Sequence, residues 1–432
     1  MEGSGKGRRP MVSVLLDRAF EHFMTMGRLD VRYPDGDRRV YAGRAGPRAG
    51  MWIANPATAR ALLLDPALKV GEAYMAGDLL PVDCTLYDLL HVLMLNVMER
   101  SPAGERVFSS LRYMARAWLQ NNTLRRARRN VAHHYDLDSR LYRLFLDEDM
   151  QYSCGYFPTG NETLEQAQSA KKHHLAAKLH LIHPGMSVLD IGCGWGGMAL
   201  TLARDYGARV TGITLSVEQL HIARQRAREA GLEGRVNFDL LDYRAVAGQY
   251  DRIISIGMFE HVGVAHYGLF FDAIRHALKP SGVMVLHSIG RVEGPGVTNP
   301  WIDRYIFPGG YSPAVSEAVG AVERAGLWMT DCEIWRLHYA RTIAHWRSRF
   351  AARRELIARL YDARFCRMFE FYLAVSELAF RVQGHLNFQL QLTREIDAVP
   401  LARDYMMGQN PISTPLCNSA ASAFYGAAVL RA

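Results

Sequence analysis

Cysteine is scarce in this chain and is nowhere clustered. The six cysteines are Cys84, Cys154, Cys193, Cys332, Cys366 and Cys417. Because no two of them form a CxxC pair or a disulfide-dense spacing, a disulfide-stabilised scaffold is excluded and a reducing compartment is expected. The paired histidines at 133/134 and 173/174 have no cysteine or carboxylate at a matching spacing, and adjacent helical residues point in different directions. We therefore expect no bound metal.

Long hydrophobic runs are also missing. The polar, glycine-rich residues 1–10 precede no apolar segment of the kind that a secretory signal contains. The longest apolar stretch, residues 89–98, is interrupted by His91 and Asn96 and is too short to span a bilayer. We expect a cytoplasmic protein whose contact with a membrane is peripheral, at the inner face.

Acidic residues are fewer than basic residues in this chain. The chain has 51 Lys and Arg against 43 Asp and Glu, a net charge of +8 and a pI near 9.2. This balance favours an anionic partner, either nucleic acid or an acidic membrane surface, although solubility alone would also explain it. The densest basic cluster is Arg125-Arg126-Ala127-Arg128-Arg129. It suits lipid phosphates or a solvated helix face, and no stacking-aromatic module accompanies it for nucleic acid. We favour the membrane.

The length of 432 residues predicts two domains. Helical spacing over residues 11–30 gives way to a strand-like run, and the turn 34–37 predicts a hairpin with residues 39–41. A further strand at 51–54 and helices at 56–64 and 86–98 complete a small mixed α and β unit. We place the N-terminal domain at 1–120, a basic linker at 121–132 and the second domain at 133–432.

The second domain is organised around residues 188–197. There an apolar run ends in Asp190 and is followed at once by Gly192-Cys193-Gly194-Trp195-Gly196-Gly197 and an amphipathic segment. A strand that turns tightly into a helix needs glycine, both for positive φ and for the close approach of a ligand to the backbone. The pattern predicts a nucleotide cradle.

Polar residues end each of the next strands. The strand at 209–213 ends in Thr214-Leu215-Ser216 and supplies no acid for ribose hydroxyls, which argues against a dinucleotide. The strand at 236–240 ends in Asp242-Tyr243, suited to an adenine amine and its flat face. A fourth strand at 250–256 runs into residues 257–263. This rhythm predicts a doubly wound parallel sheet with its ligand across the strand ends, and we infer S-adenosylmethionine.

Four further segments carry expectations. Residues 216–219 have the form of a capping box, with both Ser216 and Gln219 facing the ligand. After a turn at 280–282, residues 283–290 form a buried strand with His287 at its end. The loop 291–300 and the following residues 301–310 resemble a substrate lid. Residues 341–393 are helical in pattern and rich in aromatics, which form a core or line an apolar tunnel.

Taken together, these motifs resemble the cyclopropane fatty acid synthases, which use S-adenosylmethionine to act on unsaturated acyl chains of phospholipids. The likeness covers about residues 12–395. Its motifs are Tyr152-Ser153-Cys154-Gly155-Tyr156, the glycine cradle, residues 257–263, His287-Ser288-Ile289-Gly290, residues 305–310 and His338-Tyr339. Residues 71–78 look like the N-terminal lipid-binding domain of the bacterial phospholipid enzymes. The resemblance implies a Rossmann-like class I methyltransferase domain with a helical cap.

The resemblance also implies roles for individual residues. In that family a bicarbonate ion acts as the base, in a pocket formed by the residues that match Cys154, Glu260, His287, Ile289 and Tyr339. Cofactor contacts come from those that match Tyr152, Ser153, Gly192, Gly194, Thr214, Leu215, Gln219, Asp242 and Tyr243. The missing acid after the second strand is then a family trait. A homodimer formed through the N-terminal domain is a further implication, which the sequence itself does not show.

The chemistry of these residue types agrees with that resemblance. An isolated cis alkene is a poor nucleophile, so the sulfonium methyl must be aligned with it in a dry pocket. Aromatic faces stabilise the resulting carbocation without attacking it. A base then removes a proton from the added methyl. Plain backbone bracing by Glu260 and simple packing of Cys154 are the alternatives.

Other functions remain open at this point. The same carbocation quenched differently gives a methylated or 10-methylene branched chain. An inactive lipid-binding or transfer protein, and a nucleic-acid methyltransferase, are further alternatives. Headgroup, double-bond position, oligomeric state and the tail after Gly408 are not indicated by the sequence.

Overall fold

The computed structural model describes residues 11–99 and 139–407. The basic cluster at 125–129, His133, His134, both proposed domain boundaries and the tail lie outside these ranges. The expectations placed on them therefore stay predictions.

A four-stranded sheet forms the N-terminal unit, in the order β2-β1-β3-β4. Its strands are β1 (Met26–Arg32), β2 (Arg38–Ala42), β3 (Arg44–Ile53) and β4 (Leu79–Pro81). Its helices are α1 (Met11–Phe23), α2 (Pro56–Leu64), α3 (Pro66–Ala76) and α4 (Leu86–Glu99). The predicted hairpin is confirmed, because β1 and β2 pair antiparallel across the turn that Tyr33 and Asp37 close. The predicted helices at 56–64 and 86–98 are also confirmed.

Asn96, which interrupts the apolar run of α4, is fully buried and ties the helix to the sheet. Its Oδ1 accepts hydrogen bonds from the backbone N–H groups of Thr25 (2.7 Å) and Met26 (2.9 Å). Its Nδ2 donates to the carbonyl of Met26 (2.9 Å). A buried amide that bonds three backbone groups avoids the cost of an unpaired polar group. The residue therefore fixes where β1 begins against α4.

A seven-stranded sheet forms the second unit, in the order β10-β11-β9-β8-β5-β6-β7. Its strands are β5 (Ser187–Ile191), β6 (Arg209–Thr214), β7 (Val236–Leu240), β8 (Tyr250–Ile256), β9 (Leu278–Arg291), β10 (Trp328–Trp335) and β11 (His385–Thr393). Strands β5 to β9 pair parallel, as predicted, whereas β11 runs antiparallel to both of its neighbours. The doubly wound fold is confirmed, with an antiparallel edge.

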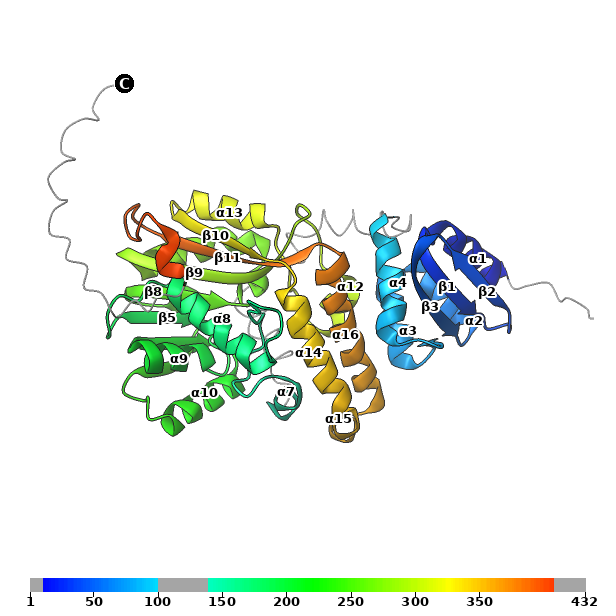
Figure 1. Ribbon diagram of the computed structural model, residues 1–432, viewed down its shortest axis with the longest axis horizontal. Coiled ribbons are helices and arrows are strands. Elements are labelled where there is room, and N and C mark those ends of the chain that lie inside the picture. Colours follow the sequence, from blue (N-terminus) through cyan, green and yellow to red (C-terminus); the bar gives the residue numbers. More distant parts are fainter. Residues whose placement is uncertain (1–10, 100–138, 408–432) are drawn as a thin grey trace, which may run out of the picture.

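Helices cover both faces of this sheet (Figure 1). The first set packs on one face and comprises α8 (Leu164–Lys178), α9 (Gly197–Tyr206) and α10 (Val217–Glu229). The other face carries α11 (Tyr267–Ala277) and α13 (Val315–Arg324). Because both faces are covered, most residues of the central strands β5, β6 and β8 are buried. This arrangement leaves the C-terminal ends of the strands as the open edge.

Two expectations about the second unit were wrong. Residues 341–393 are not helical throughout, because His385–Thr393 forms β11. Its apolar residues alternate from Leu386 to Leu392, and the intervening Asn387, Gln389 and Gln391 are buried on the other face. The turn expected at 280–282 is a bulge within β9, where the pairing with β8 skips from Leu278 to Val283. His287 accordingly lies inside this strand, opposite Ile256, and not at its end.

A helical cap stands between the two sheets (Figure 1). It comprises α7 (Ser139–Phe145), α12 (Pro300–Tyr305), α14 (His338–Ala352), α15 (Arg354–Leu360) and α16 (Ala363–Val382). Trp301 on α12, where we expected a lid, is fully buried between Gly71 of α3 and Phe371 of α16. Glu72 accepts a hydrogen bond from the Tyr305 hydroxyl at 2.9 Å. The N-terminal unit therefore docks on the helical cap through α12 and α16.

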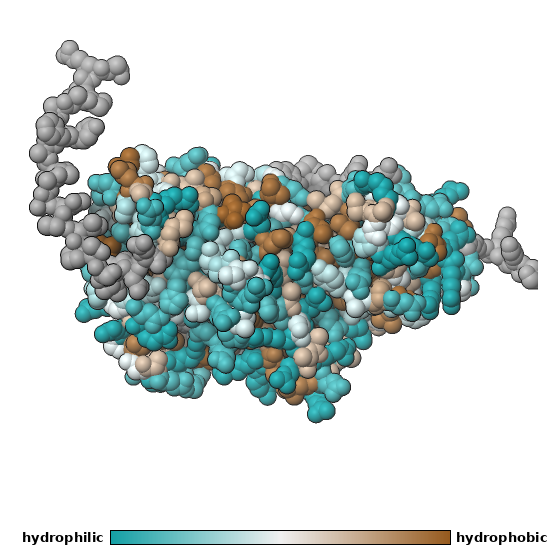
Figure 2. Space-filling model, in the orientation of Figure 1, coloured by the Kyte–Doolittle hydropathy of each residue, from teal (hydrophilic) through white to brown (hydrophobic). Residues whose placement is uncertain are grey.

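No helix within the described ranges is long and apolar enough to cross a membrane. Figure 2 shows the hydrophobic residues of one face as separate patches among hydrophilic ones. Scattered patches of this kind are ordinary for a folded domain.

Candidate active site

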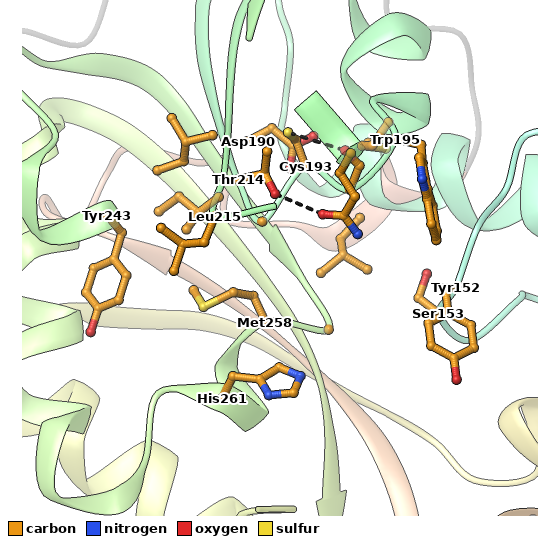
Figure 3. A pocket seen from close by; sticks show the side chains of 18 of the residues that line it. Tyr152, Ser153, Asp190, Cys193, Trp195, Thr214, Leu215, Tyr243, Met258 and His261 are labelled. Atoms are coloured by element: carbon orange, nitrogen blue, oxygen red, sulfur yellow. Dashed lines mark hydrogen bonds between the residues drawn. The ribbon is translucent and has the colours of Figure 1, made fainter. Parts of the chain in front are cut away.

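A pocket opens at the C-terminal ends of β5, β6, β7 and β8 (Figure 3). All nine residues predicted to contact the cofactor line it: Tyr152, Ser153, Gly192, Gly194, Thr214, Leu215, Gln219, Asp242 and Tyr243. They come from the segment before α8, from the end of β6, from the loops after β5, β6 and β7, and from the first turn of α10. In Figure 3, Tyr243 lies on one side of the pocket and Tyr152 and Ser153 on the opposite side. The structure thus assembles the predicted set around one elongated space.

The glycine cradle forms one wall of this pocket. Gly192 and Gly194 have φ values of 79° and 55°, in the left-handed region that favours glycine. A Cβ at Gly192 would approach the Cβ of Met258 to 2.9 Å. The backbone N–H groups of Gly192 and Cys193 both donate to the carbonyl of Ile213, at 2.9 and 3.0 Å, which fixes the loop against β6. A side chain at residue 192 would therefore displace Met258, which also lines the pocket.

The Gln219 side chain makes a different hydrogen bond from the one that a capping box would require. Ser216 caps α10 by accepting a hydrogen bond from the backbone N–H of Gln219, at 3.2 Å. The Gln219 side chain does not complete a capping box, because its Oε1 accepts from the Thr214 hydroxyl at 2.8 Å (Figure 3). That hydroxyl in turn accepts from the backbone N–H of Ser216, at 3.2 Å. Of the two, only Gln219 borders the pocket, and its amide nitrogen remains to donate to a ligand.

Asp242 and Tyr243 sit at the far end with Arg244. Both carboxylate oxygens of Asp242 accept from the Arg244 guanidinium, each at 2.7 Å. The guanidinium carbon lies 5.2 Å from the centre of the Tyr243 ring. Because carboxylate oxygens have further lone pairs, Asp242 can also accept from a ligand amine. The arrangement suits a flat heterocycle with an exocyclic amine.

Sequence reasoning singled out Asp190 as the end of a strand but missed it as a site residue. It lines the pocket, is buried, and its Oδ2 has no hydrogen-bond partner among the described residues. Burial raises the pKa of this carboxyl to about 7. The signal was present, because an acid at the end of a buried strand and next to a glycine turn faces the strand-end crevice. Trp195, Met258 and His261 also line the pocket and were missed.

The residues that line the pocket fit S-adenosylmethionine. A glycine wall in which a Cβ at residue 192 would meet Met258, an orphaned buried carboxylate oxygen and an aromatic end with an acceptor are all present. The aromatic end with its acceptor suits the nucleoside. The orphaned carboxylate oxygen suits the ammonium group of the amino-acid tail. The residues therefore match the two ends of that molecule.

Glu260 does not itself line this pocket but lies between two residues that do, Met258 and His261, in the short 3-10 helix η2 (Phe259–His261) after β8. Its Oε1 accepts a hydrogen bond from the backbone N–H of Ile289 at 2.7 Å. Its Oε2 is buried and has no partner in the described part of the chain. Burial raises the pKa of the carboxyl to about 7, although the Ile289 bond works against that rise. Glu260 is therefore poised to exchange a proton near neutral pH.

His287 is held neutral between two amides of β11. Burial lowers the pKa of its imidazole to about 3. The amide nitrogen of Gln389 lies 3.2 Å from Nδ1, and that of Asn387 lies 3.4 Å from Nε2. A neutral imidazole has one donor and one acceptor nitrogen, so one of these amides must present its oxygen instead. Both ring nitrogens of His287 thus lie within hydrogen-bond reach of β11 amides.

Cys154 and Tyr339 approach from the cap. The backbone N–H of Gly155 donates to the Thr342 hydroxyl of α14 at 2.9 Å, one turn from Tyr339. Burial raises the pKa of the Cys154 thiol well above its ordinary value, which keeps it uncharged. Of the five residues predicted to form the base pocket, Glu260 and Ile289 are joined directly. His287 lies two residues before Ile289 on the same face of β9.

Aromatic side chains of the cap enclose the other side of Tyr152. Its ring lies 5.2 Å from that of Tyr142 and 5.1 Å from that of Trp346, centre to centre. Its hydroxyl lies 2.7 Å from the hydroxyl of Tyr372. Burial raises the pKa of the Tyr152 hydroxyl well above its ordinary value. One face of this residue thus borders the cofactor pocket while the other belongs to an apolar, aromatic cluster.

Metal binding finds no support in the described ranges. No group of three His, Cys, Asp or Glu side chains there is close enough to hold an ion. His174 instead lies 2.7 Å from a carboxylate oxygen of Glu333, and His173 lies 3.0 Å from the Tyr206 hydroxyl.

Comparison with known proteins identifies the family. A family model described as mycolic acid cyclopropane synthetase matches residues 122–390. The chain belongs to this family. It is 37% identical to the cyclopropane-fatty-acyl-phospholipid synthase of Escherichia coli over 81% of its own length and 89% of that protein. It is 42% identical to a probable fatty acid methyltransferase of Pseudomonas putida, but over 60% of its own length and 66% of that protein.

A solved structure agrees with these relatives. The mycolic acid cyclopropane synthase CmaA1 complexed with SAH and CTAB has a TM-score of 0.58 and 30% identity, over 61% of this chain and 97% of that one. The family places this chain among the S-adenosylmethionine-dependent methyltransferases, as the sequence motifs indicated.

Proposed function

We propose that this methyltransferase transfers a methylene unit from S-adenosylmethionine to the cis double bond of phospholipid acyl chains, forming a cyclopropane ring. The observation that carries the proposal is the position of Tyr152. It borders both the cofactor pocket and the aromatic cluster of the cap. A methyl donor on one side of this residue would face an apolar chain on the other. The relative of 37% identity from Escherichia coli bears the name of this activity.

Alignment is the first task of the site. The alkene attacks the sulfonium methyl carbon, forming a carbon–carbon bond as the bond to sulfur breaks, and one alkene carbon becomes cationic. Holding the two groups in contact supplies much of the rate, because an isolated alkene is a weak nucleophile. Aromatic rings such as those of Tyr142 and Trp346 stabilise a cation through their faces and form no adduct with it. A water-free aromatic cluster therefore suits this carbocation.

Removal of a proton from the added methyl closes the ring. The Oε2 of Glu260 is the orphaned, buried acceptor next to the pocket, and its carboxyl has a pKa of about 7. Bicarbonate held by Glu260 and its neighbours would supply a base of modest strength. Cys154, His287, Ile289 and Tyr339 are the neighbours we propose for it, and His287 would exchange one of its two β11 amide contacts for the ion. The uncharged Cys154 thiol is a poor nucleophile and would not trap the cation.

A branched-chain product is the second candidate. The Pseudomonas putida relative is named as a probable fatty acid methyltransferase, with no ring in that name. In that reaction a 1,2-hydride shift moves the positive charge of the same carbocation to the methyl-bearing carbon. Loss of a proton from the added methyl then gives a methylene branch. An inactive lipid-binding protein and a nucleic-acid methyltransferase are weaker alternatives, because the cradle and Glu260 are intact.

We further propose that the enzyme works on the anionic inner face of the membrane as a peripheral, cytoplasmic protein. The support is its net charge of +8 and the cluster at Arg125, Arg126, Arg128 and Arg129. A homodimer stays a prediction from the family resemblance.

The deciding experiment is proton NMR of lipids extracted after the purified protein acts on S-adenosylmethionine and vesicles of a cis-monounsaturated phospholipid. Upfield cyclopropane methylene signals support the proposal. Signals of a C=CH2 branch would replace the proposal with the branched-chain reaction. Proton NMR is needed because the cyclopropane and methylene products have the same mass. Unchanged lipid together with absent cofactor binding would support the inactive lipid-binding protein. Activity that survives nuclease treatment disposes of the nucleic-acid alternative.

A further inference from the structure

Lys171 is a fully buried lysine that no sequence motif pointed to. It lies on α8, behind the segment that carries Tyr152. Its Nζ donates to Gln151 Oε1 and to Ser153 Oγ, each at 2.7 Å. Gln151 and Ser153 both line the cofactor pocket, so this ammonium lies one side chain behind the pocket wall.

The charge of Lys171 has no ion-pair partner at close range. No carboxylate within the described ranges lies within 4.0 Å of it, whereas the neighbouring Lys172 and Lys178 both pair with acids. Burial lowers the pKa of the Lys171 ammonium to about 8. Asp147 and Asp149 attract this ammonium at longer range, but burial still outweighs them, and a bound anion would offset more of that cost. An anionic group in the pocket would have this effect.

The contact also decides how Ser153 can bond to a ligand. A lysine ammonium only donates, so Ser153 Oγ must accept from it and its own hydroxyl hydrogen is left to donate elsewhere. Gln168 fixes the same segment from α8, because its Nε2 donates to the backbone carbonyl of Ser153 at 2.8 Å. Ser153 is thus held in place as a hydrogen-bond donor with a positive charge behind it.

Another polar group that lines the pocket has the opposite sign. Asp190 Oδ2 is the buried acceptor without a partner described above. A donor backed by a cation together with an anionic acceptor matches an amino-acid zwitterion. Tyr243 on the opposite side of the pocket suits the adenine, which leaves the Ser153 side for the methionine portion (Figure 3).

We propose that Lys171 is a positioning residue, which through Ser153 holds the α-carboxylate of S-adenosylmethionine while Asp190 receives the α-ammonium. This inference rests on cofactor binding by the family and not on the nature of the acyl product. A failure of the lipid reaction would therefore leave it standing, and the test below uses no lipid.

The test is calorimetric titration with three nucleosides: S-adenosylhomocysteine, its decarboxylated amine, and 5′-methylthioadenosine. In the wild-type protein, loss of the carboxylate should weaken binding roughly 10- to 100-fold, the range for a hydrogen bond to a charged group. In Lys171→Met, the affinity for S-adenosylhomocysteine should fall by a similar factor. The affinities for the two ligands without a carboxylate should change less than about threefold. That selective loss is the signature of a contact with the carboxylate.

Two further variants make the outcome decisive. Lys178→Met removes another buried lysine of α8, paired to Asp331, and should leave the ratio among the three ligands unchanged. Ser153→Ala should reproduce the carboxylate-selective loss, and in the double variant with Lys171→Met the two losses should not add. Equal weakening of all three ligands in Lys171→Met would reduce Lys171 to a structural role. If that variant does not fold, an undiminished carboxylate effect in Ser153→Ala overturns the proposal by itself.

Discussion

The backbone N–H of Ile289 on β9 donates a 2.7 Å hydrogen bond to Oε1 of Glu260 on η2. The bond joins two neighbouring strand ends of the sheet through a side chain. The backbone carbonyl of Glu260 is also occupied, because it accepts from the N–H of Tyr311 at 2.9 Å. The residue is therefore held at both ends, and its second carboxylate oxygen is left for chemistry.

Replacement of Glu260 by Gln should abolish most of the activity while sparing the fold. The amide oxygen of Gln can still accept from Ile289, but the side chain can no longer exchange a proton. We expect a loss of roughly 100-fold or more in kcat, the range of general acid–base catalysis. Affinity for S-adenosylhomocysteine, measured alongside, should stay within about twofold. Full activity in this variant would remove Glu260 from the reaction.

The same variant should change how stability depends on pH. Burial raises the pKa of Glu260 from 4.5 to about 7, so the folded state favours the protonated form. Its contribution to stability is full below pH 4.5 and is lost as pH rises through 7. The free energy of unfolding of Glu260→Gln relative to wild type should therefore rise by about 1 to 3 kcal/mol between pH 4.5 and pH 8. Denaturant titrations at both pH values measure this, and parallel curves would contradict it.

Alanine at Gly192 should damage cofactor binding beyond its backbone strain. The new Cβ would lie 2.9 Å from the Cβ of Met258, at a residue whose φ is 79°. We expect affinity for S-adenosylhomocysteine to fall roughly 10- to 100-fold as the cradle shifts. Gly231→Ala is the matched control, because Gly231 has a φ of 65° but nothing within 4 Å of its would-be Cβ. Both variants should lose about 1 to 2 kcal/mol of stability from the left-handed backbone. Only Gly192→Ala should lose affinity.

Much of the fold could be predicted from short-range pattern. The glycines after Ile191 and the polar ends of the strands predicted the sheet and the ligand edge, because these features depend on local sequence. Strand β11 was missed because its neighbour α16 is strongly helical and aromatic, and the pattern was extended through Gly384. The alternation of Leu386, Phe388 and Leu390 with amides was a period-two signal. Buried amides obscured it, since they pair with His287 and β10 only in the folded chain.

Site residues could be predicted from the sequence where they directly follow a strand. They could not be predicted where their role depends on contacts with another element of the fold. Thr214, Asp242 and Glu260 were identified for the first reason. Lys171 was missed because a lysine on a helix normally faces solvent. Its position, seven residues after Leu164 and four before Leu175, is on the buried stripe of α8 and was a usable signal.

Alanine at Gly71 should loosen the docking of the N-terminal unit without unfolding it. A Cβ there would lie 2.5 Å from Nε1 of the buried Trp301 and 2.9 Å from the Phe371 ring. Alanine favours a helix over glycine by about 1 kcal/mol, so α3 itself should not suffer. Hydrogen exchange should accelerate in α3 and in the facing turns of α16, but not in β5. Adding Trp301→Leu should recover part of the protection, and unchanged exchange in Gly71→Ala would show that the interface adapts.

Reversing the charges of Arg125, Arg126, Arg128 and Arg129 to Glu should weaken binding to anionic vesicles in a salt-dependent way. Each basic residue near such a surface contributes about 1 kcal/mol, and salt screens this attraction. We expect at least a tenfold loss at low ionic strength in vesicle co-sedimentation, shrinking as salt is raised. The control reverses four exposed arginines elsewhere: Arg209, Arg228, Arg235 and Arg275. Equal losses in both proteins would mean that net charge alone draws the enzyme to the membrane. Unchanged binding in the first would refute a docking role for the cluster, because a local patch must act through the residues that compose it.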